Sequence, residues 1–298
     1  MSGPPSTPHP PFGVAFVFSG TGLGQAPLRM PGANDRCTGA IAMPPSPSAR
    51  RAAVSAALPP VIAVLALVAL WSLLATGQPP IVLPGPVRVL QAAMNSWPSL
   101  RPAIAVTLLE TALGLGLAMA LAVPLAMALA GLPPLRRALQ PLLVASQTVQ
   151  VLAVAPLLVM WFGFGLTPKV LVVALACFFP LAISLADGLA GVDRAYLDLF
   201  ASLGARPPQT WRLLRLPAAL PAFFSGLKIA VTYGIVSATI GEWVGGSQGL
   251  GLYMLRSRNA LRIDQVFAGM LVTTLLSMAL YGAAVAAERR AMPWRRAS

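Results

Sequence analysis

The sequence contains few charged residues for its length. Asp, Glu, Lys and Arg make up 10% of the 298 residues, whereas 57% are hydrophobic. Soluble domains of this size carry charge at about a quarter of their positions, and disordered chains have low hydrophobicity. The composition therefore excludes a disordered chain, argues against an ordinary soluble domain, and indicates a protein that crosses a membrane several times.

Histidine and cysteine are also scarce. The single histidine is His9, and the two cysteines are Cys37, in a Pro/Gly-rich segment, and Cys177, in an apolar run. Two such cysteines cannot build a disulfide framework or a metal cluster. Without a histidine in the folded region, the usual general base is missing. We therefore expect no metal site and no catalytic residues.

A net charge of +13 raises the question of a nucleic-acid partner. The basic residues lie at the ends of apolar runs, and no stripe of Lys and Arg interleaved with aromatic residues is present. Nucleic-acid-binding domains show such a stripe, whereas membrane proteins place basic residues at the ends of their spans. We therefore expect membrane lipid, and not nucleic acid, around this chain.

Residues 1–48 are rich in Pro, Gly and Ser and are predicted to form a disordered N-terminal extension, because they cannot bury a core. The apolar patch Phe12–Phe18 lacks a preceding basic region, so a cleaved signal peptide is not indicated. An alternative is that translation begins at Met43. Residues 49–298 are the predicted transmembrane domain.

Six apolar windows follow, each about as long as a helix that crosses the hydrocarbon core. They are Val54–Ala75, Ala103–Ala130, Leu139–Met160, Val170–Ala186, Ala218–Trp243 and Val266–Ala287. The sequence thus predicts an all-α membrane protein with six transmembrane helices, and an even number of spans places both termini on one side.

Basic residues indicate which side that is, because Lys and Arg beside the spans are retained in the cytoplasm. More arginines flank the inner ends than the outer ends when both termini are inside. We therefore expect cytoplasmic termini in a bacterial inner membrane. Arg256, Arg258 and Arg262 weaken this asymmetry, because they share one outer segment, which we expect to be structured against the protein.

The longest polar stretch of the folded region is Val192–Leu216, between the fourth and fifth windows. Leu197 and Phe200 recur at helical spacing, Gly204 offers a conformationally free break, and Pro207 is suited to start a second helix. The stretch predicts a helix-turn-helix at the cytoplasmic membrane surface.

This stretch resembles the EAA loop of binding-protein-dependent ABC-transporter permeases. The family pattern is Glu-Ala-Ala, three residues, Gly, nine residues, a branched apolar residue, one residue, and Leu-Pro. Asp198-Leu199-Phe200 occupies the first positions, followed by Gly204, Leu214 and Leu216-Pro217 at matching spacing. Glu and both Ala are replaced, so the resemblance depends on the glycine, the intervals and the Leu-Pro ending.

Three other segments extend the resemblance over roughly residues 55–290. Ala155–Gly165, Phe178–Pro180 and Gly241–Gly251 are similar to segments of the nitrate/sulfonate/taurine branch and its thiamine-pyrimidine-precursor relatives. The resemblance implies a permease subunit of an ATP-driven importer for a small solute: an organic anion, nitrate, a sulfonate or a pyrimidine precursor.

The resemblance also implies partners: an ABC ATPase subunit, a periplasmic or lipid-anchored solute-binding protein, and a second permease, either the same chain or a related one. We expect no cofactor on this chain and ATP on the ATPase, since a phosphate-binding loop needs Gly-Lys-Ser/Thr. The two lysines, Lys169 and Lys228, follow Pro168 and Leu227.

In such permeases the loop docks on the ATPase, which implies a coupling role for residues of this stretch. They are Asp198, Ala201, Gly204, Arg206, Arg212, Leu216 and Pro217. We expect Leu197, Phe200 and Leu203 to form the docking face. For the arginines, a simple positive-inside flank is an equally open interpretation.

Polar residues inside spans usually face a pore or another helix. Gln147 and Gln150 share one helical face, Trp161 follows the third window, and Glu242 lies at the outer end of the fifth. These four are the candidate pathway residues. Hydrogen bonding between helices is the alternative for the glutamines, and a position in the interfacial aromatic belt is the alternative for Glu242.

Three other charged residues receive structural interpretations. Glu110 and Asp187 are assigned by default to the headgroup level, and Lys228 is expected to extend toward the cytoplasmic face.

An ion-coupled secondary transporter or channel is the main alternative function. It would require a buried carboxylate or a broken-helix ion site and would not need the stretch from Asp198 to Pro217. An intramembrane enzyme is weaker still, because the spans lack catalytic groups.

Overall fold

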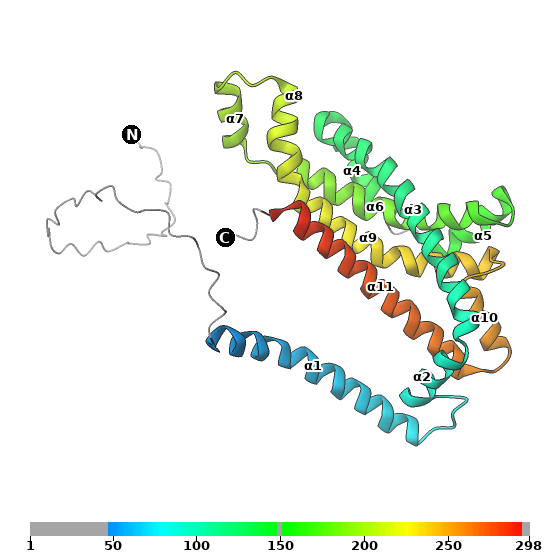
Figure 1. Cartoon of the computed structure of the whole chain (residues 1–298). Coiled ribbons are helices and arrows are strands. Elements are labelled where there is room, and N and C mark those ends of the chain that lie inside the picture. The colour runs from blue at the N-terminus through cyan, green and yellow to red at the C-terminus, as the bar shows by residue number, and fades with distance from the viewer. Residues whose placement is uncertain (1–46, 148–150, 294–298) are drawn as a thin grey trace, which may run out of the picture. The chain divides into compact units, whose positions relative to one another are not determined.

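A computed structural model describes residues 47–147 and 151–293 of the chain (Figure 1). The described residues form helices joined by short connections, and none of them lies in a strand. The prediction of an all-α protein is confirmed.

Two compact units are present, Met1–Ala57 and Leu58–Ser298. The described part of the first is the beginning of α1 (Pro47–Thr76). The predicted extension 1–48 lies almost entirely outside the described residues and stays a prediction. All elements discussed below belong to the second unit.

The remaining elements follow in chain order. They are α2 (Pro86–Asn95), α3 (Trp97–Gly131), α4 (Pro133–Ser146), α5 (Val151–Phe162), α6 (Leu166–Ala190), α7 (Arg194–Ser202), α8 (Pro207–Thr210), the π-helical turn η1 (Trp211–Arg215), α9 (Leu216–Gly245), α10 (Leu250–Asn259) and α11 (Ile263–Ala291).

Four helical stretches of the described chain are long and apolar enough to cross a membrane. They are Trp97–Gly131, Leu166–Ala190, Pro207–Gly245 and Ile263–Ala291, and they contain the second, fourth, fifth and sixth predicted windows. Ile62–Thr76 and Ala153–Phe162 are shorter apolar helices. The structure thus gives several spans of the expected kind, and the count of six remains a prediction.

The third window, Leu139–Met160, is not described as one continuous helix. α4 ends at Ser146, and α5 begins at Val151. The Ser146 hydroxyl donates to the Leu142 carbonyl over 2.7 Å, a local bond by which serine competes with the helical pattern. Ser146 and Gln147 therefore lie where α4 ends.

Close packing of α3, α6 and α9 forms the core. A Cβ atom on Gly114 of α3 would lie 2.5 Å from the Val173 side chain of α6, and one on Gly226 of α9 would lie 2.7 Å from Ser184 Cβ. Small residues let membrane helices approach this closely. The three helices thereby form a fixed scaffold for the polar residues they carry.

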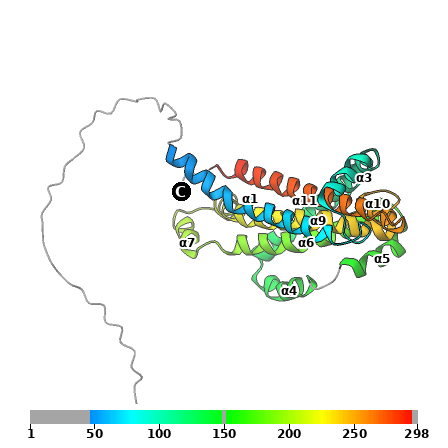
Figure 2. The ribbon, with the colours of Figure 1, turned by 90° about the horizontal axis from the view of Figure 1, so that it is seen from below.

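α9 joins two different regions. In both views α7 lies near its first residues, and α10 lies near its last (Figures 1 and 2). The polar groups described next are distributed between these two ends.

Candidate functional site

Residues 193–217 form a helical hairpin. Its first helix, α7, is capped by Asp193, whose carboxylate accepts a hydrogen bond from the Ala195 amide over 3.1 Å. The helix ends in a Schellman motif, in which the Ala205 amide donates to the Phe200 carbonyl and the Gly204 amide to the Ala201 carbonyl, both over 3.0 Å. Gly204 has a φ of +72°, a left-handed conformation that suits glycine. The predicted break at this glycine is confirmed.

The second helix begins at Pro207, as the sequence predicts. The Arg206 amide donates to Gln209 Oε1 over 2.8 Å, and proline at the first helical position needs no acceptor. From Pro207 the helix continues through η1 into α9, so the second helix of the hairpin is continuous with the span that ends at Gly245.

The base of the hairpin is anchored on α3. The Arg215 guanidinium lies 5.0 Å from the centre of the Trp211 ring and donates to the Ala130 carbonyl over 3.4 Å. Trp211 also packs against the core cluster that includes Leu129 and Leu185. A fixed base with an exposed tip is an arrangement that can transmit a force applied to the tip.

The tip exposes an apolar face. Tyr196, Leu199 and Leu203 are 58%, 51% and 74% exposed, and their spacing of i, i+3 and i+7 places them on one side of the α7 region. We call these three residues the α7 face. The predicted face was Leu197, Phe200 and Leu203, but the first two are half-buried, so the helix is rotated relative to that expectation.

Most of the predicted coupling residues are exposed on the hairpin. Asp198, Ala201, Gly204, Arg206, Arg212 and Leu216 are exposed, and Pro217 is half-buried. Their surroundings leave them accessible to a partner, whereas their role stays a prediction.

Gln147, one of the predicted pathway residues, lines a hollow of about 490 Å³ between α4, α6 and α9. The lining residues are Ser146, Gln147, Leu175, Ala176, Phe179, Pro180, Ile183, Ser184, Ile229, Tyr233 and Ser237. Trp161 is 68% exposed on α5 and does not line this hollow. Gln150 lies outside the described residues.

Glu242 is buried in a cluster of charged groups at the last turns of α9. Its carboxylate accepts hydrogen bonds from the Thr107 hydroxyl over 2.6 Å and from the Gly251 amide over 2.5 Å. Lys169 Nζ donates to Glu110 Oε1 over 2.7 Å. We call Glu110, Lys169 and Glu242 the outer cluster, because the predicted orientation places this end of α9 on the outer side. It links α3, α6, α9 and the start of α10.

The outer cluster changes two expectations from the sequence. Glu242, predicted at the mouth of the pathway, has no exposed surface in this conformation. Glu110 is completely buried beside Lys169 instead of lying open to headgroups. The available signal was that Glu110 and Lys169 are opposite charges in apolar surroundings, where each needs a partner.

Two further ion pairs join the helices. Lys228 Nζ lies 2.7 Å from Glu288 Oε2 of α11, so this lysine, which was expected to extend toward the cytoplasmic face, has an acidic partner. Arg136 and Asp187 form a more exposed pair at 3.1 Å.

Buried carboxylates are the feature that an ion-coupled transporter would require. Here Glu110 is paired with Lys169, and Glu242 accepts two hydrogen bonds. Both carboxylates therefore have structural partners, and their burial alone is not evidence for an ion-coupled transporter.

Comparison with known proteins decides which family the chain belongs to. The family described as "Binding-protein-dependent transport system inner membrane component" matches residues 112–292. The chain is 38% identical over 226 residues to a probable ABC transporter permease protein of Haemophilus influenzae, covering 75% of this chain and 92% of that protein.

Relatives with a stated solute are also similar. The formylaminopyrimidine transport permease protein ThiX of Halalkalibacterium halodurans is 35% identical over 243 residues, covering 80% of this chain and 97% of the relative. The taurine transport system permease protein TauC of Escherichia coli is 32% identical over 237 residues, covering 76% and 86%.

Among solved structures, the inward-facing MetNI methionine ABC transporter has a similar fold. The TM-score is 0.58 at 17% sequence identity, covering 65% of this chain and 96% of that chain. Taken with the family match and the relatives, the all-helical core identifies the chain as a member of the binding-protein-dependent inner membrane transport components: it is the permease subunit of an ABC importer of the nitrate/sulfonate/taurine branch, and not an enzyme.

Proposed function

We propose that the chain crosses the inner membrane six times with both termini in the cytoplasm, and that it encloses the solute path together with a second copy or a related permease. The four long and two shorter apolar helices support this count. The excess of arginine at the inner ends supports the orientation.

The exposure of the α7 face is the main support for the proposal that the hairpin couples the permease to an ATPase. Three large apolar side chains exposed on one short helix favour contact with a partner protein. We propose that this face docks on an ABC ATPase subunit, which binds the ATP. Gly204 then sets the turn, and Leu216 and Pro217 join the hairpin to α9. Asp198, Ala201, Arg206 and Arg212 contact the ATPase or the lipid headgroups.

The hollow beside Gln147 is proposed as part of the solute path. Within the described chain its lining is uncharged and combines the aromatic rings of Phe179 and Tyr233 with an amide and three serine hydroxyls. A site for a free sulfonate is strengthened by a cation, and no Lys or Arg of the described chain lines this hollow. The lining therefore favours a neutral ring compound with hydrogen-bonding groups, such as the formylaminopyrimidine of one relative, over taurine or sulfonates. Gln150, Trp161 and Glu242 stay predictions for other parts of the path.

Affinity purification of the tagged chain from its native membrane in mild detergent tests the assembly. Mass spectrometry should identify an ATPase subunit with a phosphate-binding loop and a solute-binding protein among the retained proteins. A chain recovered alone, under conditions that preserve known complexes, would contradict the coupling proposal and favour ion-driven transport.

Uptake into proteoliposomes tests the solute class. We expect ATP-dependent uptake of labelled formylaminopyrimidine by the complex with its binding protein, and reduced uptake when Tyr233→Ala removes the ring from the hollow. Tyr281→Ala is a matched control, because this tyrosine is also exposed but does not line the hollow. Uptake of taurine without uptake of the pyrimidine would contradict the proposed class.

A further inference from the structure

A second hollow lies between the last turns of α9, the helix α10 and the first half of α11. Its volume is about 410 Å³. Its lining includes Val236, Thr239 and Trp243 from α9, Arg258 from α10 and Met270 from α11. We call this hollow the α9–α11 groove. It is separate from the hollow proposed for the solute, since no residue lines both.

The wall of the α9–α11 groove offers few hydrogen bonds to a ligand. The hydroxyl groups of Thr239, Thr273 and Thr274 each donate to a carbonyl of their own helix, over 2.8–2.9 Å. Apart from Arg258, the other lining residues are apolar or aromatic. A polar solute would lose hydrogen bonds to water on entering such a space, whereas a hydrocarbon chain has none to lose.

One charged residue lines the groove. Arg258 is exposed, no Asp or Glu of the described chain lines the groove, and no ion pair within the described residues includes this arginine. The planar donors of a guanidinium match the oxygens of a phosphate group. Arg258 is therefore available to an anionic headgroup.

The polar and apolar parts of the groove lie at different depths. Trp243 is in the last turn of α9, and tryptophan is enriched where the hydrocarbon core meets the headgroups. Val236 lies seven residues earlier, or about 10 Å deeper along the helix at 1.5 Å per residue. The groove thus combines a cation near headgroup level with an apolar wall at hydrocarbon level.

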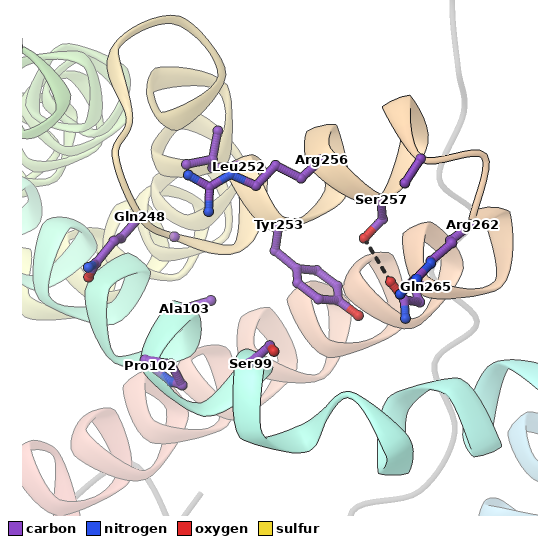
Figure 3. A pocket seen from close by; sticks show the side chains of 12 residues that line it. Ser99, Pro102, Ala103, Gln248, Leu252, Tyr253, Arg256, Ser257, Arg262 and Gln265 are labelled. Atoms are coloured by element: carbon purple, nitrogen blue, oxygen red, sulfur yellow. Dashed lines mark hydrogen bonds between the residues drawn. The ribbon is translucent and has the colours of Figure 1, made fainter.

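α10 turns a different face to the cavity drawn in Figure 3. Arg256 lines that cavity but not the groove, and Arg258 lines the groove but not that cavity. Residues two positions apart point about 200° away from each other on a helix. The Ser257 hydroxyl donates to Gln265 Oε1 over 3.3 Å and ties α10 to α11 (Figure 3), which holds the wall that carries Arg258 in place.

We propose that the α9–α11 groove binds an anionic phospholipid, with its phosphate on Arg258 and an acyl chain along Val236 and Met270. The inference goes beyond the proposed function and requires only that α9 and α11 cross the membrane. Basic pockets between transmembrane helices recognise anionic headgroups. A zwitterionic headgroup fits less well, because its own cation would be repelled by Arg258.

The experiment uses the permease complex purified in mild detergent, depleted of lipid, and then supplied with phosphatidylglycerol or phosphatidylcholine. Native mass spectrometry measures the bound lipid, and thermal unfolding measures the stabilisation by each lipid. Arg258→Gln removes the charge, Arg258→Lys keeps it, and Val236→Trp narrows the groove.

Two variants serve as matched controls. Arg256→Gln removes an exposed charge from the other face of α10. Leu275→Trp enlarges a side chain of α11 that does not line the groove and is 56% exposed, compared with 49% for Val236.

The wild type should bind phosphatidylglycerol in preference to phosphatidylcholine and should unfold at a higher temperature with it, because a ligand of the folded state stabilises that state. Arg258→Gln should weaken phosphatidylglycerol binding about fivefold or more, and Val236→Trp should weaken binding of both lipids. Arg258→Lys and both controls should bind like the wild type. Equal binding of the two lipids by the wild type would overturn the proposal, as would an unchanged Arg258→Gln variant or an equal loss with Arg256→Gln.

A second copy of the chain is the competing occupant of the groove. If Val236→Trp separates the permease subunits while Arg258→Gln binds lipid like the wild type, the groove is a contact between permeases and the proposal is overturned. A complex that lacks an ATPase or a second permease would instead contradict the proposed function alone, because lipid binding can be measured on the full chain in the same way.

Discussion

The two ends of α9 bury their polar groups to opposite degrees. At its last turns, Glu242 is fully buried in the outer cluster, where it accepts hydrogen bonds from α3 and from the start of α10. At its first turns, the helix continues into a hairpin whose α7 has no buried residue. Buried charges require specific partners, whereas an exposed hairpin is fixed mainly by its own turn and caps. The end of α9 at Glu242 is therefore expected to be rigid, and the hairpin end to be available for a partner.

Loss of the lysine in the outer cluster should have the largest effect on stability. Lys169→Met would leave Glu110 and Glu242 buried without a cation, and breaking a buried pair costs about 3–5 kcal/mol. We expect a large fall in thermal stability, measured by unfolding of the purified protein in detergent. The control is Lys228→Met, whose pair with Glu288 is partly exposed and should matter less. Equal losses for the two variants would contradict the expectation that the fully buried cluster contributes more to stability than a partly exposed ion pair.

Gly249→Ala tests the same end of α9 by introducing backbone strain and a clash beside Glu242. Gly249 has a φ of +127°, and a Cβ atom there would overlap the Glu242 carboxylate. Strain and overpacking together should cost about 2–4 kcal/mol. Gly116→Ala is the control, because its Cβ would meet no atom within 4 Å, and it should be neutral or slightly stabilising. A Gly249→Ala protein as stable as the control would show that the cluster tolerates repacking.

Gly204→Val should damage function more than stability. The φ of +72° costs a β-branched residue about 1–2 kcal/mol, but a Cβ at this position has open space. We expect an inserted, folded protein whose ATP-dependent uptake is lost. Gly204→Asn should retain more uptake, because asparagine adopts the left-handed conformation more readily. Normal uptake with valine would count against the coupling role of the hairpin.

Leu203→Glu should have the smallest effect on stability, because this side chain is 74% exposed. Replacement should leave the unfolding temperature unchanged within error, while retention of the ATPase during purification falls. Leu213→Glu is a matched control, with 67% exposure outside the α7 face. If both variants retain the ATPase equally well, the α7 face is not the docking surface.

The sequence predicted the hairpin well because its signals are local. Gly204 and Pro207 act through their own backbone geometry, and both the break and the second helix were placed correctly. The orientation of α7 was less predictable. Leu197 and Phe200 carry the expected helical spacing, but which side of a short helix becomes covered depends on neighbours that are distant in the sequence.

The outer cluster was missed for the same reason. Glu110 and Lys169 lie 59 positions apart, and their pairing depends on the close packing of α3 against α6. Apolar windows identify helices, but they do not specify which helices are neighbours. The end of α4 at Ser146 was also hidden, because a hydropathy window continues across a few polar residues.

The length of α9 has a mechanical consequence. If the outer cluster acts as the pivot, Tyr233 lies about 14 Å from it and Leu216 about 39 Å from it, at 1.5 Å per residue. A tilt of about 5° would then move the first turn of α9 by about 3 Å but the wall of the hollow by only about 1 Å. A wide movement at the hairpin end would thus become a fine adjustment of the space around the solute, delivered with correspondingly greater force.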